Sequence, residues 1–171
     1  MSDTVAVFGH GAPLSDPVLA GLALRDVTRL RHGGAPDSRI APLLEPFLDP
    51  FTRSFLFGLE SRAFDSAARI VLWRQGAGAL HACRYAAELR RLGLLPDGPP
   101  LHLWNRATSP GAGAAAFDRQ QDARLAGALA SLARQSPLDR DGPLAALEAR
   151  QAAGDIPGAL AFARRLAARA Q

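Results

Sequence analysis

Apolar and polar positions along the chain form blocks that favour an α/β fold. Short apolar runs rich in β-branched residues predict four buried strands, the clearest at residues 70–73, where four apolar residues follow one another. Between and after these runs, apolar positions recur every three or four residues, as they do on one face of a helix. The predicted strands are residues 4–8, 25–30, 67–73 and 101–105, and the predicted helices are residues 17–21, 49–64, 80–93 and 114–135.

This alternation of strands and helices predicts a Rossmann-like or flavodoxin-like parallel sheet of about four strands, with helices on both faces. We interpret residues 1–171 as a single α/β domain in which residues 1–135 supply the sheet and its helices. Residues 136–171 are predicted to form a helical C-terminal tail, since Asp141 and Asp155 each stand where they can cap a helix, two residues before a proline.

Composition narrows the classes of partner. The 20 basic residues are all arginine and are scattered, and the net charge is only +4, so no basic run with interleaved aromatics indicates a nucleic-acid surface. Cys83 is the single cysteine, which excludes a disulfide within the chain. No apolar run approaches the roughly 20 residues of a membrane span, and the first residues lack the pattern of a signal peptide. We therefore expect a cytoplasmic protein that binds neither nucleic acid nor membrane.

Ligands of parallel sheets bind at the carboxyl ends of the strands, so the candidate loops are residues 9–16, 31–50, 74–80 and 105–112. A Gly-His-Gly turn follows the first strand, and a glycine-rich turn of this kind lets a ligand approach the backbone. The catalytic residues remain unassigned and no metal site is expected, because two histidines do not complete one. The residues that we expect at a candidate cleft are His10, Asp49, Arg53, Gln75 and His81.

Each candidate also has a purely structural explanation. A tight turn with an exposed imidazole explains His10, and a solvated helix face explains His81, which shares that face with charged residues. Asp49 precedes a proline and acts as a helix N-cap in either case. Cys83 lies among alanines on its helix and is expected in the core, where a thiol without a paired base is no nucleophile.

Taken in order, the segments resemble one α/β domain of the 2-hydroxyacyl-CoA dehydratase and benzoyl-CoA reductase family. The resemblance runs from about residue 5 to residue 166 and depends on arrangement more than on identity. The segment VAVFGHGAPLSDPVLAGLALRDVTRL matches the family's strand, proline-containing loop and short helix. The family's Cys-Pro-Phe-x-Arg-Ser helix start corresponds to DPFTRS, which begins at Asp49. The segments FDSAARIVLWRQGAGA and PPLHLWNRATSP then correspond to its later strands and loops.

In that family a subunit usually contains two such domains, three cysteines hold an iron–sulfur cluster, and an ATP-using activator supplies electrons for an acyl-CoA substrate. The three cysteine positions fall here near Gly9 or His10, at Asp49, and near Gln75 or Gly76, and none is cysteine. The resemblance therefore implies a non-catalytic relative without a cluster or other cofactor, an accessory or subunit-like binding protein. Its partner would be a second copy or a dehydratase-like subunit, and an acyl-CoA ligand is compatible but without support from the residues.

Two alternatives stay open. The class II tetrapyrrole chelatases of the sirohydrochlorin type also place Gly-His-Gly after the first strand, and GAGALHA resembles the region of their second histidine, so His10 and His81 would hold the metal. Against this stand the short segment between the first two strands and the helical tail. The other alternative is an unrelated flavodoxin-like interaction domain. An active enzyme is less expected than a binding protein.

The aromatic content of one segment predicts a contact surface. Residues 47–64 contain five phenylalanines, more than one helix face can bury in a small domain. We therefore expect Phe57 or Phe64 at the surface, where it would pair with a second copy or with a partner subunit.

Overall fold

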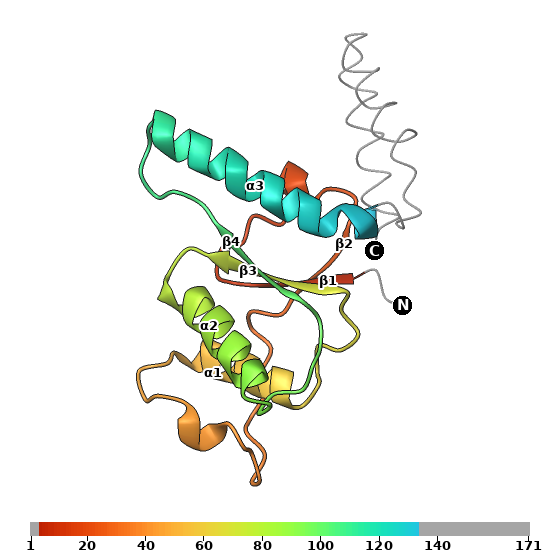
Figure 1. Cartoon of the computed structure of the whole chain (residues 1–171), viewed down its shortest axis with the longest axis vertical. Helices are drawn as coiled ribbons and strands as arrows, with labels where there is room; N and C mark the ends of the chain where they lie inside the picture. Colours follow the sequence, from red (N-terminus) through yellow and green to blue (C-terminus); the bar gives the residue numbers. More distant parts are fainter. Residues whose placement is uncertain (1–3, 134–171) are drawn as a thin grey trace, which may run out of the picture. The chain divides into compact units, whose positions relative to one another are not determined.

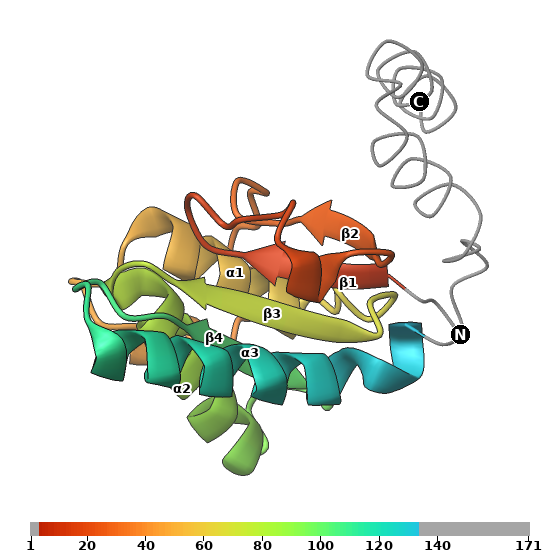
Figure 2. The ribbon, with the colours of Figure 1, turned by 90° about the horizontal axis from the view of Figure 1, so that it is seen from above.

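The computed structural model describes residues 4–133, which form a four-stranded parallel sheet with helices on both faces (Figures 1 and 2). The sheet has the strand order β2-β1-β3-β4. This confirms the predicted fold class. The predicted helical tail, residues 136–171, lies outside the described residues. The strands are β1 (Thr4–Phe8), β2 (Ala23–Asp26), β3 (Arg69–Arg74) and β4 (Leu101–Asn105).

The central strands β1 and β3 are apolar except at their ends, because helices cover both faces of the sheet. Val7 pairs with Val71 and Phe8 with Leu72 across β1 and β3, and side chains alternate between the two faces along each strand. Val5, Val7 and Val71 face one core, whereas Phe8 and Leu72 face the other, and all five are almost completely buried. Strands buried on both faces cannot alternate apolar with polar residues, which is why their sequences read as continuous apolar runs.

The helices form two layers (Figure 1). On one face α1 (Pro50–Glu60) and α2 (Ala77–Arg91) cover the larger core, to which they contribute Phe55, Leu59, Ala82 and Leu89. On the other face lie α3 (Ala112–Ala133) and the short 3-10 helix η1 (Pro17–Leu19); a second one, η2 (Ala41–Leu43), precedes α1. Along the described helices, none combines the length and apolar character needed to cross a membrane.

The second strand ends earlier than predicted. β2 stops at Asp26 instead of continuing to residue 30, because the Asp26 carboxylate accepts the backbone N–H of Thr28 at 2.8 Å and turns the chain. The Thr28 hydroxyl oxygen then accepts the N–H of Gly9 at 2.9 Å. The turn after β2 is thereby fixed to the loop after β1.

The aromatic prediction was wrong for Phe64. Helix α1 ends at Glu60 and not at residue 64, and Arg62, with φ of 60°, turns the chain back beneath the helix. Phe64 is only 2% exposed, with its ring stacked on Phe55 at 5.4 Å. Gly58 makes room for it, since a Cβ there would lie 2.5 Å from the Phe64 ring. Phe57 is partly buried against the same core, and the phenylalanine left at the surface is Phe47, at 65% exposure.

Candidate functional site

A crevice opens where the strand connections diverge. From β1 the chain continues to β2, at one edge of the sheet. From β3 it continues through α2 to β4, at the opposite edge. The carboxyl ends of β1 and β3 therefore flank the position at which doubly wound sheets bind ligands. A cavity of about 480 Å³ occupies it. The cavity is lined by Phe8, Gly9, His10, Asp49, Phe51, Thr52, Trp73, Gln75, Gly76, Gly78 and Ala79.

The loop after β1 is held against the end of β3 by two glycines. Gly9 has φ of 139°, and a Cβ at this position would lie 2.4 Å from the carbonyl oxygen of Trp73. Gly11 has φ of 66° and approaches the side-chain oxygen of Gln75. Larger residues would meet both the backbone strain of positive φ and the facing loop. The Gly-His-Gly turn is thus a requirement of close packing, and it presents His10 at the rim.

Helix α1 begins at the crevice with Asp49, and both carboxylate oxygens of this residue accept hydrogen bonds. Asp49 Oδ1 accepts the backbone N–H groups of Phe51 and Thr52 at 3.0 and 2.9 Å, and its Oδ2 accepts the Thr52 hydroxyl at 2.6 Å. Burial by itself would raise the pKa of Asp49, but the hydrogen bonds from Thr52 and Phe51 outweigh it and lower the pKa. Asp49 is therefore ionised at neutral pH and already committed to capping.

Helix α2 begins at the same crevice without such a cap. Its N-cap is Gly76, which offers no side chain to the first-turn N–H groups, and a Cβ at Gly76 would meet nothing within 4 Å. Two residues later the space is closed, since a Cβ at Gly78 would lie 2.7 Å from Asp49 Oδ2. The start of α2 is packed tightly against α1 on one side and open to the crevice on the other.

An aromatic wall borders the crevice. The rings of Phe51 and His10 meet edge to face, with 4.4 Å between their centroids. The guanidinium carbon of Arg31 lies 4.6 Å from the centroid of the same Phe51 ring. Because His10 and Arg31 are both exposed, this wall places two polar side chains at the mouth of the crevice.

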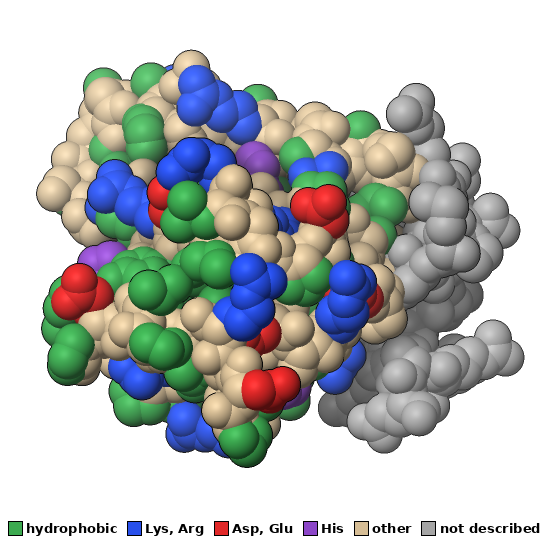
Figure 3. All heavy atoms as spheres, turned by 60° about the horizontal axis from the view of Figure 1, so that its bottom comes forward, with side chains coloured by type: hydrophobic (Ala, Val, Ile, Leu, Met, Phe, Trp, Pro, Cys, Tyr) green, Lys and Arg blue, Asp and Glu red, His purple; other side chains and the backbone are tan. Residues whose placement is uncertain are grey.

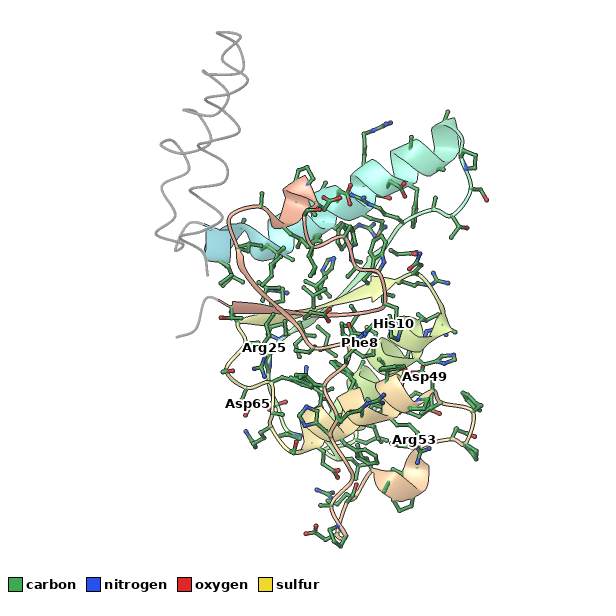
Figure 4. The ribbon with its side chains drawn as sticks, turned by 180° about the vertical axis from the view of Figure 1, so that it is seen from behind. Phe8, His10, Arg25, Asp49, Arg53 and Asp65 are labelled. Atoms are coloured by element: carbon green, nitrogen blue, oxygen red, sulfur yellow. The ribbon has the colours of Figure 1, made fainter. Side chains whose placement is uncertain are left out.

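The structure brings together three of the five residues predicted for the cleft. His10, Asp49 and Gln75 line the crevice, and Figure 4 shows His10 and Asp49 at the same edge of the sheet, with Arg53 farther along α1. Arg53 lines a different cavity, where its Nη1 donates to the carbonyls of Leu44 and Glu45. The His81 ring instead contacts Phe47, with 5.7 Å between the centroids.

Three contributions to the crevice were not among the five predicted residues: Phe51, Thr52 and the pair of glycines at the start of α2. The signal was present in the spacing Gly76-Ala77-Gly78 directly after a buried strand. A glycine at the start of a helix and another two residues later indicate a close approach by neighbouring backbone or by a ligand.

The crevice does not suit a thiolate-bound cluster. The three positions that the resemblance assigns to cysteine ligands all line it, but they hold glycine or histidine, aspartate, and glutamine or glycine. Cys83 lies on α2 against the larger core, where burial raises the pKa of its thiol and Arg84 partly offsets this. Within residues 4–133, no group of three or more His, Cys, Asp or Glu side chains could hold a metal ion.

An ion network fixes the loop after β1 from the other face of the sheet. Arg106 Nη2 lies 2.9 Å from Asp16 Oδ2 and 2.7 Å from Asp122 Oδ2, and the Trp104 indole N–H donates to Asp122 Oδ1 at 2.9 Å. Hydrogen bonding to Asp122 raises the pKa of Arg106. Asp16 also caps η1, so the network ties β4 and α3 to the segment that follows His10. The crevice is therefore built on rigid supports on both faces of the sheet.

Comparison of the chain with protein-family models, with curated proteins and with solved structures finds no match.

Proposed function

We propose that the protein is a ligand-binding accessory or subunit-like protein that holds a small molecule in the crevice between β1 and β3. In this proposal it is a cytoplasmic relative of a 2-hydroxyacyl-CoA dehydratase or benzoyl-CoA reductase domain that works without an iron–sulfur cluster. The observation that carries the proposal is the cavity of about 480 Å³ at the point where the strand connections diverge.

Binding fits the crevice residues better than catalysis does. Asp49 is the only carboxylate among the residues that line the cavity, and both of its oxygens already accept hydrogen bonds. A lowered pKa makes it a poor general acid. The described hydrogen bonds include none between His10 and a nucleophile or a carboxylate, which a catalytic pair would use. A preformed cavity with an open helix start and an aromatic wall suits recognition.

The chelatase alternative receives less support. It needs His10 and His81 over one cleft, but only His10 lines the crevice, and His81 contacts Phe47. The segment between β1 and β2 contains a three-residue 3-10 helix where that family has a full-length helix. Co²⁺ or Ni²⁺ titration of the wild type and of His10→Ala tests this directly: micromolar binding that is lost in the variant would favour the chelatase.

The main test fills the crevice without disturbing its walls. Gly76→Leu adds a side chain where a Cβ has no neighbour within 4 Å, and its extended φ of −145° suits any residue. Gly127→Leu is the matched control, because Gly127 is exposed on α3 and a Cβ there also meets nothing within 4 Å. Thermal shift and native mass spectrometry with acetyl-CoA, butyryl-CoA, ATP and FMN as probes would compare both variants with the wild type.

We expect at least one probe to bind the wild type and Gly127→Leu, and to bind Gly76→Leu at least about tenfold more weakly. A tenfold loss corresponds to one displaced contact of ordinary strength. Binding that is equal in all three proteins would place the ligand elsewhere and contradict the proposal. If the bound probes are the acyl-CoA thioesters alone, the dehydratase-like assignment gains support, and if FMN alone binds, the unrelated flavodoxin-like alternative does.

A further inference from the structure

A second cavity lies beside the crevice and is lined by basic side chains. It measures about 450 Å³ and forms a groove between α1 and the loop that follows β2. We call it the basic groove. Its lining residues are Arg31, His32, Gly33, Pro50, Arg53, Ser54 and Phe57, of which none is acidic. Pro50 and Phe57 supply apolar surface, so the groove combines an apolar floor with positive charge.

The two arginines of the groove lack carboxylate partners. Arg31 is exposed and its guanidinium rests on the Phe51 ring, and Arg53 Nη1 donates to two backbone carbonyls at 3.3 Å each. In the described part of the chain, neither forms an ion pair, whereas Arg62, Arg91 and Arg106 all do. Figure 3, in which the bottom of Figure 1 comes forward, shows arginine, acidic and hydrophobic side chains interspersed on that face.

The groove is held in shape before any ligand arrives. The His32 backbone N–H donates to Ser54 Oγ at 2.7 Å, and the Ser54 hydroxyl donates to the Leu30 carbonyl at 2.8 Å. On the far side of the loop, a Cβ at Gly34 would lie 2.8 Å from the Phe57 ring. The backbone on both sides of Arg31 is therefore fixed to α1. Because this backbone is already fixed, binding an anion there costs little backbone conformational entropy.

The groove and the crevice share one wall. Phe51 lines the crevice, where His10 packs against it at 4.4 Å, and Arg31 covers the same ring at 4.6 Å. Along α1, Pro50 and Arg53 of the groove flank Phe51 and Thr52 of the crevice. A molecule that fills the crevice can therefore extend past Phe51 toward the two arginines.

We infer that the basic groove binds the anionic group, a phosphate or a carboxylate, of the molecule whose body occupies the crevice. This inference rests on the proposed function for the body of the ligand but assigns its charged end to Arg31 and Arg53. Guanidinium groups favour such anions because their N–H donors match the two oxygens of a carboxylate or phosphate. None of the residues that line the groove carries a carboxylate that would compete with the ligand for the two arginines.

The test uses small anions that lack the part of the ligand expected in the crevice, so its result does not depend on binding there. Pyrophosphate and succinate are titrated into the full-length wild type by isothermal calorimetry, and the two arms distinguish phosphate from carboxylate recognition. The variants are Arg31→Gln, Arg53→Gln and, as the control, Arg84→Gln, which changes an exposed arginine on α2 outside both cavities. Arg53→Lys retains the charge, and melting curves exclude unfolding as the cause of lost binding.

We expect at least one of the two anions to bind the wild type, more weakly as salt rises, and Arg31→Gln to weaken it about tenfold while Arg84→Gln leaves it unchanged. Gly76→Leu should leave this binding intact, even though it blocks the crevice. No binding of either anion, or equal binding in Arg31→Gln and the control, would overturn the inference without touching the proposed function. Loss in Gly76→Leu alone would move the anion to the start of α2 and would also overturn it.

Discussion

The two helices that start at the crevice begin in opposite ways. Helix α1 has an aspartate N-cap, a proline in its first turn and a threonine hydroxyl bonded to the cap, so its first donors are satisfied within the protein. Helix α2 has glycine at its N-cap and no side chain that accepts its first N–H groups. The two starts are in contact, because Gly78 lies against the Asp49 carboxylate.

The first-turn N–H groups of α1 have a structural role, whereas those of α2 remain available to water or a ligand. A helix leaves four N–H groups without intrahelical partners at its start, and a protein either caps them or leaves them to water and ligands. At α1 the cap supports the fold, and Thr52 Oγ1 also lies 3.1 Å from the Gly78 carbonyl oxygen, so the two helix starts are in close contact. At α2 no side chain caps the first donors, and the helix start lines the crevice. The comparison predicts that equal changes at the two starts will have unequal effects.

The largest expected effect comes from the two glycines of α2. Gly78→Val forces a branched side chain against Asp49 and Thr52, which should destabilise the protein by about 2–3 kcal/mol through overpacking. Gly76→Val places the same side chain in open space and should cost about 1 kcal/mol or less, from the poorer N-cap. Urea denaturation followed by circular dichroism measures both free energies of unfolding. Equal losses would mean that the close approach of the two helices is not what restricts position 78.

Removing the cap of α1 should have the next largest effect. Asp49→Ala takes away the acceptor of two backbone N–H groups and of the Thr52 hydroxyl, for which we expect a loss of about 1–2 kcal/mol. Thr52→Val removes only the hydroxyl and should cost less. Chemical denaturation of the two single variants and of the double variant checks the order, and a double variant that is merely additive would deny the coupling between them.

The same residue makes stability depend on acid pH. The pKa of Asp49 is lower in the folded protein than its ordinary value of 3.8, so the ionised carboxylate stabilises the fold. This contribution is complete above the unfolded pKa and is lost as the pH falls below 3.8 through the folded pKa. Asp49→Asn should therefore lose less stability than the wild type between pH 5 and pH 2. Parallel slopes for the two proteins in this range would show that the cap carries no net charge effect.

Much of this fold follows from the chain pattern alone. The apolar run at residues 70–73 lies at the centre of β3, and β4 has the predicted bounds of residues 101–105. Both were predictable because a buried strand is a short apolar run bounded by turn residues. The end of β2 was not predictable, since it depends on Asp26 bonding to Thr28 and on Thr28 bonding to a loop 19 residues away. Nor was the burial of Phe64, which depends on a cavity that Gly58 leaves across the turn.

The site was predictable in its location more than in its composition. The rule for the carboxyl ends of parallel strands placed His10, Asp49 and Gln75 together, because it depends on topology only. It could not separate Arg53 from the crevice, since Arg53 is one residue from Thr52 but points to another side of α1. Whether a side chain lies on one side of a helix start or the other depends on the loops that pack there, and these loops are fixed by tertiary hydrogen bonds such as that of Ser54 to Leu30.

The smallest expected effect is also the most direct test of the open helix start. Gly76→Ser supplies a hydroxyl that can accept an N–H group of the first turn of α2, in an extended backbone conformation that suits an N-cap. We expect a gain of about 0.3 kcal/mol over the wild type, whereas Gly76→Ala should give none. Gly33→Ser is the control for a serine in open space away from a helix start. Replicate urea titrations resolve the difference, and equal stability of Gly76→Ser and Gly76→Ala would mean that the first-turn donors of α2 are not available to an acceptor.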